Sequence, residues 1–156
     1  MLAEKIMVTD VVTALEDDLV SDVFKKMRAS NHRMLPVIDA NKCIVGVLST
    51  FCVLEHVVPD YLISGDLKEI SYAPDMGILS RHYQEIADQP IKNVMSKKPL
   101  CVNQSESILS VAAALSSFGR HEYAMVINSE KHLLGIISAG DILDRLAEVG
   151  SEVTDA

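Results

Sequence analysis

The chain repeats a part of its own sequence, and this duplication limits the folds that it can adopt. The stretch GVLSTFCVL, which starts at Gly46, returns as GIISAGDIL at Gly135, 89 positions later (135 − 46). Glycine, serine and leucine keep their places, and two aliphatic residues follow each glycine. The aspartate does not keep its place, because Asp141 corresponds to Cys52. Self-similarity at a fixed spacing indicates two copies of one structural unit.

The similarity extends well beyond this stretch. At the same spacing, VFKKMRASNHRMLPVIDANKC falls on AAALSSFGRHEYAMVINSEKH, which brings His32 onto His121. Further upstream, Met7 matches Met95 at a spacing of 88 (95 − 7), so Pro99 looks like a one-residue insertion. Each copy therefore spans about 50 residues, a length typical of repeated units.

Each copy predicts the order strand, helix, strand, strand, helix. Apolar residues at helical spacing follow a capping residue, which is Asp17 or Asp18 in the first copy and Ser105 in the second. Gly119 suits the left-handed residue that ends such a helix. Two short aliphatic runs come next, separated by the turn-forming sequences DANK and NSEK, which predicts a β-hairpin in each copy.

These patterns predict an α/β fold made of two β-α-β-β-α repeats related by pseudo-twofold symmetry. One copy is too small to bury a sheet and two helices well, so the copies are expected to form one module. The expected organisation is the first repeat over 1–58, a linker with a short helix over 59–90, the second repeat over 91–149 and a flexible tail over 150–156.

Composition and charge exclude several classes of function. The net charge of −8, with four tyrosines, three phenylalanines and no tryptophan, is unsuited to binding nucleic acid, which requires basic and base-stacking surfaces. No apolar run approaches the roughly 18 residues of a membrane span, and the start lacks the pattern of a signal peptide. Three cysteines without a CxxC pair favour free thiols, and we expect a cytoplasmic protein.

The duplicated pattern resembles a tandem pair of cystathionine-β-synthase (CBS) domains, called a Bateman module. The resemblance is carried by MLPVIDANKCIVGVLS, NVMSKKPLCV and GIISAGDIL. It implies an α/β fold that dimerises, with a central cleft that binds adenine nucleotides or related adenosyl ligands. The linker also resembles that of standalone bacterial members.

The stretch from Ser138 to Asp141 has two interpretations. It matches a capping box, in which a serine caps a helix and an acid three residues later reaches back to the serine's backbone. In the resembling family, the same pattern is a ribose clamp, since a carboxylate can accept hydrogen bonds from both ribose hydroxyls. The first repeat keeps Ser49 but has Cys52, whose sulfur is a weak acceptor, and Phe51 adds bulk. We therefore expect two structural corners but only one ribose site, at Ser138 and Asp141.

The resemblance also implies positions for the base and the phosphates. Arginine suits phosphate, whereas Glu122 would repel it, so a monophosphate or a weakly charged adenosyl compound is favoured. The competing interpretations are core packing for the apolar residues and solvated loop charge for the basic ones. The predicted base-binding residues are Met7, Thr9, Val11 and Met34, and the predicted phosphate-binding residues are His32, Arg33, Arg120 and His121.

The predicted function is a non-catalytic regulatory module that binds AMP, ADP, ATP or another adenosyl ligand and requires no cofactor. The alternative is a dimeric protein-interaction module whose ligand site has degenerated. Apolar residues around the helices FCVLEHVV and DILDRLAEV predict a homodimer built on both helices, and the regulated protein is unknown. Cys52 and His56, four positions apart, could hold a metal only with further ligands, and no catalytic nucleophile or phosphate loop is evident.

Overall fold

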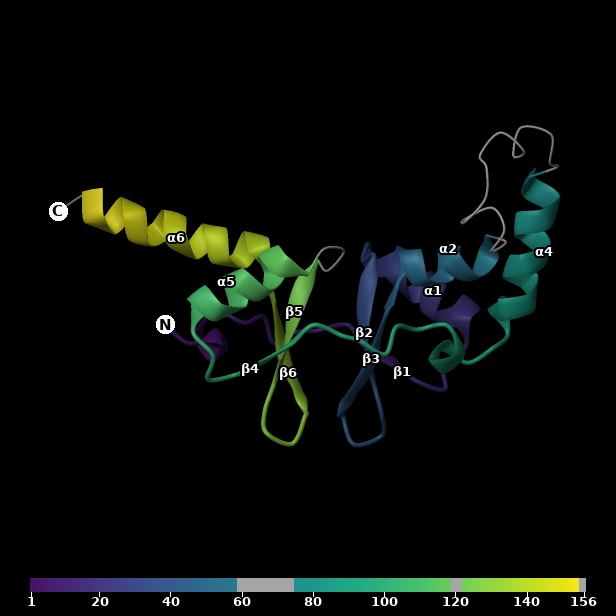
Figure 1. Cartoon of the computed structure of the whole chain (residues 1–156), viewed down its shortest axis with the longest axis horizontal. Helices are drawn as coiled ribbons and strands as arrows, with labels where there is room; N and C mark the ends of the chain where they lie inside the picture. Colours follow the sequence, from purple (N-terminus) through teal and green to yellow (C-terminus); the bar gives the residue numbers. More distant parts are fainter. Residues whose placement is uncertain (59–74, 119–121, 155–156) are drawn as a thin grey trace. The chain divides into compact units, whose positions relative to one another are not determined.

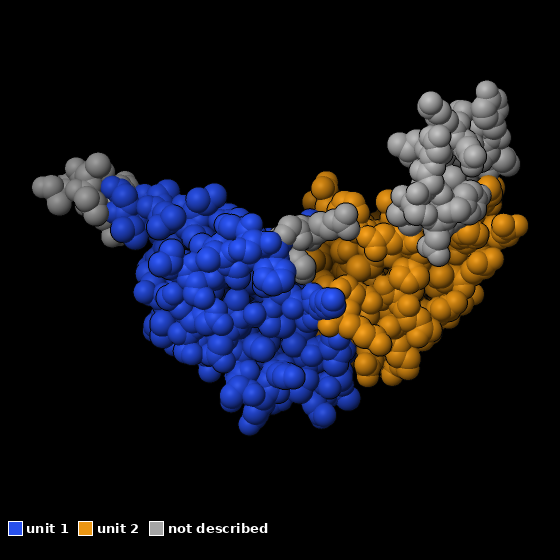
Figure 2. Space-filling view, in the orientation of Figure 1, with its two compact units in different colours: residues 1–13, 38–45, 98–156 blue, residues 14–37, 46–97 orange. Residues whose placement is uncertain are grey.

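The computed structural model confirms the α/β fold with two three-stranded sheets, ordered β1-β2-β3 and β4-β5-β6 (Figure 1). It describes residues 1–58, 75–118 and 122–154. The chain divides into two compact units (Figure 2). Unit 1 comprises residues 1–13, 38–45 and 98–156, and unit 2 comprises residues 14–37 and 46–97. The units therefore differ from the sequence repeats, because each contains the opening segment of the other repeat.

Unit 2 contains most of the first repeat. Helix α4 packs against α1 and α2 and is the short helix expected between the repeats. The N-cap of α1 is Leu19, which has no side-chain capping bond, whereas the Asp18 carboxylate accepts a bond from the Leu15 N–H (2.9 Å). The elements are β1 (Ala14–Leu15), α1 (Val20–Ser30), β2 (Met34–Ile38), β3 (Ile44–Ser49), α2 (Thr50–Val57), α4 (Asp75–Ala87) and the short 3-10 helix η3 (Ile91–Asn93).

Unit 1 contains the second repeat from residue 98 onward. The parallel pair β4–β5 aligns Val102 with Val126, and the antiparallel pair β5–β6 aligns Val126 with Gly135. A buried cluster that includes Val102, Val111, Val126 and Ile137 forms its core. The elements are η1 (Ala3–Lys5), β4 (Cys101–Asn103), α5 (Ile108–Ser117), β5 (Tyr123–Ile127), β6 (Leu133–Ser138) and α6 (Ala139–Thr154).

Two boundaries in the second repeat differ from the sequence interpretation. The cap of α5 is Ser107, whose hydroxyl accepts a bond from the Ser110 N–H (3.1 Å), whereas Ser105 bonds to Asn103. Helix α6 continues to Thr154, so residues 150–154 are helical although the sequence predicted a flexible tail from 150. Gly119, the predicted helix-ending residue, lies outside the described residues.

The opening segments of the two repeats are exchanged between them. We call residues 1–13 the first arm and residues 91–97 the second arm. The first arm pairs with the second repeat through Val8 and Ile136, whose N–H groups each donate to the other's carbonyl (2.8 and 2.9 Å). The second arm pairs with the first repeat in the same way through Ser96 and Val47 (2.9 and 3.0 Å).

The close approach of each arm explains the repeated glycine. A Cβ atom at Gly135 would lie 2.7 Å from the Val8 carbonyl oxygen, and one at Gly46 would lie 2.7 Å from the Ser96 carbonyl oxygen. Both distances are too short for any side chain without movement of the backbone. Glycine is therefore required at both positions because an arm crosses there, and not because of an unusual backbone angle.

Candidate functional site

The strand-to-helix corner of unit 1 forms a complete capping box between β6 and α6. The Asp141 N–H donates to Ser138 Oγ (3.1 Å), and the Ser138 N–H donates to Asp141 Oδ2 (2.9 Å). These reciprocal bonds confirm the structural interpretation of this motif. Among the described residues, no donor is bonded to the other carboxylate oxygen, Oδ1, and both side chains are half-buried. The corner therefore holds one carboxylate oxygen in place while the second can accept further bonds.

The matching corner of unit 2 has a cap but no carboxylate. The Cys52 N–H donates to Ser49 Oγ (3.1 Å), and the Ser49 hydroxyl donates to Cys52 Sγ (3.2 Å). Ser49 thus caps α2, but Cys52 cannot replace the Asp141 carboxylate, which accepts a bond from the backbone N–H of Ser138. The residue before Cys52 is Phe51, whose side chain is exposed, whereas the residue before Asp141 in unit 1 is Gly140.

The first arm brings some of the predicted base-binding residues into the same unit as Ser138 and Asp141. The Met7 side chain packs against the core cluster of unit 1 and against Gly135, so packing accounts for its position. Thr9 is exposed and Val11 is half-buried, which leaves their side chains accessible. Of the predicted base-binding residues, Met34 belongs to unit 2 and is buried.

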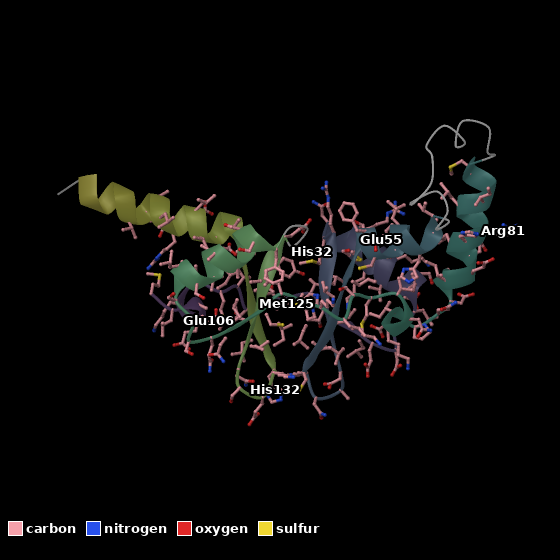
Figure 3. All side chains as sticks on the ribbon, in the orientation of Figure 1. His32, Glu55, Arg81, Glu106, Met125 and His132 are labelled. Carbon is pink, nitrogen blue, oxygen red and sulfur yellow. The ribbon has the colours of Figure 1, made fainter. Side chains whose placement is uncertain are left out.

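The predicted phosphate-binding residues are only partly described. His32 lies just before β2 in unit 2, where its Nδ1 is hydrogen bonded to Ser30 Oγ (2.7 Å) (Figure 3). The Arg33 side chain is exposed, and its carbonyl accepts a bond from the Thr50 N–H (3.0 Å), which fixes its backbone to the start of α2. Arg120 and His121 lie outside the described residues.

The Cys52 and His56 pair has no third metal ligand beside it in the part of the chain that the structure describes. His56 Nδ1 is hydrogen bonded to the Cys52 carbonyl (2.8 Å), so the ring is directed back along its own helix. Among the residues that the structure describes, no group of three His, Cys, Asp or Glu side chains is placed to hold an ion. The three cysteines are free and half-buried.

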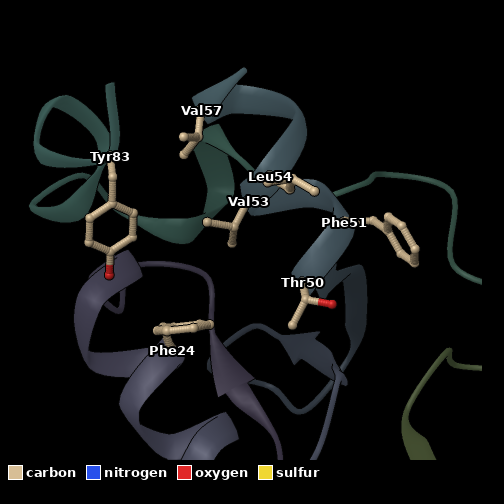
Figure 4. A pocket seen from close by; sticks show the side chains of 7 residues that line it. All are labelled: Phe24, Thr50, Phe51, Val53, Leu54, Val57 and Tyr83. Carbon is tan, nitrogen blue, oxygen red and sulfur yellow. The ribbon is translucent and has the colours of Figure 1, made fainter. Parts of the chain in front are cut away.

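Unit 2 also contains an apolar pocket that the sequence did not predict. It lies among α1, α2 and α4, and Phe24, Val53 and Tyr83 line it (Figure 4). The packing of α4 creates this pocket, and that packing depends on a segment that is not part of the duplication. The one signal in the sequence was Phe51, a bulky residue in place of glycine. In the described ranges, no helix is long and apolar enough to cross a bilayer.

The fold and the corners define a class of protein: a paired-repeat module in which each repeat receives an arm from the other. The family model of the CBS domain matches residues 3–58 and 91–148, and the chain therefore belongs to the CBS domain family.

Known proteins with similar sequence or structure are also CBS proteins or contain comparable regions. Inosine-5′-monophosphate dehydrogenase from Methanocaldococcus jannaschii is 25% identical over 143 residues, which are 92% of this chain but only 23% of that enzyme. The crystal structure of CBSX2 from Arabidopsis thaliana in complex with AMP has a TM-score of 0.71 and 18% identity, covering 96% of this chain and 98% of that one. A proposed archaeal homolog of g-AMPK from M. jannaschii has a TM-score of 0.73 and 16% identity, covering 93% of this chain and 47% of that one.

Proposed function

We propose that this protein is a non-catalytic regulatory module of the cytoplasm, and that the corner at Ser138 and Asp141 binds the ribose of an adenine nucleotide or adenosyl ligand. The observation that carries the proposal is the asymmetry of the two corners. Both keep the serine that caps a helix, but only one has a carboxylate with an oxygen left for a ligand. The AMP complex of CBSX2, which has the same fold, supports the choice of ligand.

The geometry of the corner suits a pair of ribose hydroxyls. The Ser138 N–H holds Asp141 Oδ2, so the carboxylate is already ordered before a ligand arrives. Its second oxygen can then accept hydrogen bonds from the ribose hydroxyls, and hydrogen bonds to a charged acceptor are the stronger kind. Gly140 has no side chain, and a Cβ there would meet only Ser138 Oγ, at 3.6 Å, which leaves the surface open.

We propose that the base and the phosphate are bound by residues that the sequence indicated. Thr9 and Val11 are accessible on the first arm, whereas Met7 would contribute mainly by supporting that arm. Met34 as a base-binding residue, and His32, Arg33, Arg120 and His121 as phosphate-binding residues, stay predictions from the sequence, since Met34 is buried in unit 2. Because few cations are available, AMP or a weakly charged adenosyl compound fits better than ATP.

The alternative function is a dimeric protein-interaction module without a ligand. It is supported by Cys52 in place of an aspartate, and by the exposed apolar residues of α6, which include Leu143 and Leu146. We propose that the homodimer forms on α6, where Leu143, Leu146 and Val149 are exposed, whereas Phe51 and Leu54, the exposed apolar side chains of α2, line an apolar pocket. Leu146→Glu is expected to give a monomer in light scattering at micromolar concentration. A wild-type protein that is already monomeric there would contradict the dimer.

Calorimetric titration with AMP, ADP and ATP tests the ligand proposal. Asp141→Ala removes a charged hydrogen-bond acceptor, which typically costs about 1.5–3 kcal/mol, or roughly 10- to 150-fold in affinity. Cys52→Ala is the matched control in the other corner, and it should leave the affinity nearly unchanged. Equal effects of the two substitutions, or tight binding by Asp141→Ala, would place the ribose elsewhere. If no adenosyl compound binds the wild-type protein, the interaction module is the better description.

A further inference from the structure

The apolar pocket of unit 2 has the size of a small-molecule site. Its volume is about 440 Å³, within the range of roughly 300–1,000 Å³ that such sites occupy. Side chains from three helices line it, and Figure 4 shows Phe24 and Tyr83 on the side opposite Val53 and Leu54. The polar groups among the described lining side chains are the hydroxyls of Thr50 and Tyr83, and no charged side chain is among them.

Helix α4 is held in the position that forms this pocket. The Tyr83 ring meets the Phe24 ring edge to face, with centroids 6.5 Å apart and planes at 66°, a favourable arrangement for aromatic pairs. His82 Nδ1 is hydrogen bonded to the Val57 carbonyl at the end of α2 (2.9 Å). Ile86, one turn further along, is buried. The wall formed by α4 is therefore anchored by an aromatic contact, a hydrogen bond and apolar packing.

The duplication provides an internal comparison. The positions of Phe24 and Phe51 are taken by Ala113 and Gly140 in the second repeat, 89 residues later in both cases (113 − 24 and 140 − 51). Tyr83 comes from the segment between the repeats, which occurs once. Phe24 and Phe51 are thus specific to the first repeat, which also lacks the carboxylate of the ribose corner, and Tyr83 comes from the linker.

We propose that this pocket is a second binding site, distinct from the Ser138 corner, for a small uncharged molecule that contains an aromatic ring. The aromatic walls favour a flat apolar ring, and the hydroxyl of Tyr83 or of Thr50 can hydrogen bond to a polar substituent. A charged ligand is disfavoured because its charge would be desolvated without a partner. The volume of the pocket suits a small molecule. An occupied pocket would stabilise unit 2, since a ligand that binds only the folded state raises its stability.

Fluorescence titration with 2-naphthol tests this proposal, and 2-naphthoate of nearly equal shape is the charged counterpart. The chain has no tryptophan, so naphthol emission is observed with little background from the protein. We expect saturable binding of 2-naphthol and at least tenfold weaker binding of 2-naphthoate. Leu54→Ala should weaken naphthol binding about tenfold, which corresponds to the loss of about 1.4 kcal/mol.

Leu143→Ala is the matched control, because Leu143 is the equivalent leucine of α6 and both side chains are exposed (52% for Leu54, 63% for Leu143). It should leave naphthol binding unchanged, as should Asp141→Ala, so that failure of the ribose site and failure of this pocket are distinguishable. Three results would overturn the proposal. These are no saturable binding, equal effects of Leu54→Ala and Leu143→Ala, or a change of oligomeric state in Leu54→Ala, which would make the pocket an interface between copies.

Discussion

Neighbouring backbone atoms determine which residue type is tolerated at some positions, and Gly135 is the clearest case. A side chain at this position would place its Cβ 2.7 Å from the Val8 carbonyl oxygen, so the first arm or β6 would have to move. Gly135→Ala is therefore expected to lower the free energy of unfolding by about 1–3 kcal/mol, the usual cost of overpacking. Urea denaturation followed by circular dichroism measures the change.

Gly140→Ala is the control for this prediction. A Cβ there would lie at an ordinary contact distance of 3.6 Å from Ser138 Oγ, and the residue is exposed near the start of α6. Alanine favours a helix over glycine, so this variant is expected to be equally stable or more stable by roughly 0.5 kcal/mol. A loss of stability as large as that of Gly135→Ala would show that the arm contact is not what requires glycine.

The buried Tyr123 predicts how stability depends on alkaline pH. Burial raises the pKa of its phenol above the usual range, and the Glu122 carboxylate beside it adds to this effect. The unfolded chain, with a tyrosine pKa of about 10, loses its proton first. The stabilisation is therefore complete below pH 10 or so and declines as the pH rises above that value.

Tyr123→Phe should remove part of this decline. The urea midpoint, measured from pH 8 to 11, is expected to fall less steeply for Tyr123→Phe than for the wild-type protein. Tyr83→Phe serves as the control, because this half-buried tyrosine lies in the other unit. Parallel pH profiles for the wild-type protein and Tyr123→Phe would mean that another group causes the alkaline loss.

At the scale of the helix, the two serine caps separate a structural role from a binding role. Ser49 and Ser138 each accept a bond from the N–H three residues later, at 3.1 Å. Ser49→Ala and Ser138→Ala are therefore both expected to lower the free energy of unfolding by about 1 kcal/mol. Only Ser138→Ala should also weaken nucleotide binding, because only its corner has the carboxylate. Calorimetry combined with thermal denaturation measures both effects, and an affinity loss in Ser49→Ala would contradict this separation.

The sequence predicted the elements better than their ends. The hairpins β2–β3 and β5–β6 followed from aliphatic runs separated by turn residues, and the capping box followed from the spacing of Ser138 and Asp141. The start of α1 was wrong because Asp18 bonds instead to the Leu15 N–H, a local turn that competes with the helix cap. Neither the docking of α4 nor its pocket could be predicted, since both depend on tertiary packing outside the duplication.

At the scale of the whole molecule, the exchanged arms predict an effect of truncation on a distant part of the sequence. Removing residues 1–8 deletes the fully buried Ala3 and the pairing of Val8 with Ile136. The second repeat, more than a hundred positions away, should then lose protection from hydrogen exchange at β6. The matched site in the first repeat, Val47, pairs with Ser96 and should keep its protection. Exchange followed by mass spectrometry distinguishes the two, and loss confined to the first repeat would contradict the exchange of arms.

The exchange of arms also has a consequence for the origin of the asymmetry. In a polypeptide with a single repeat, the arm that packs beside the glycine would come from a second, identical polypeptide, as in domain-swapped dimers. The two subunits would necessarily have the same residues at the strand-to-helix corner, because one gene would encode both. Duplication and fusion of that gene keep every arm contact and release this constraint. Asp141 and Cys52 could then diverge within one chain, so that specialisation of one half became possible without loss of the architecture that both halves share.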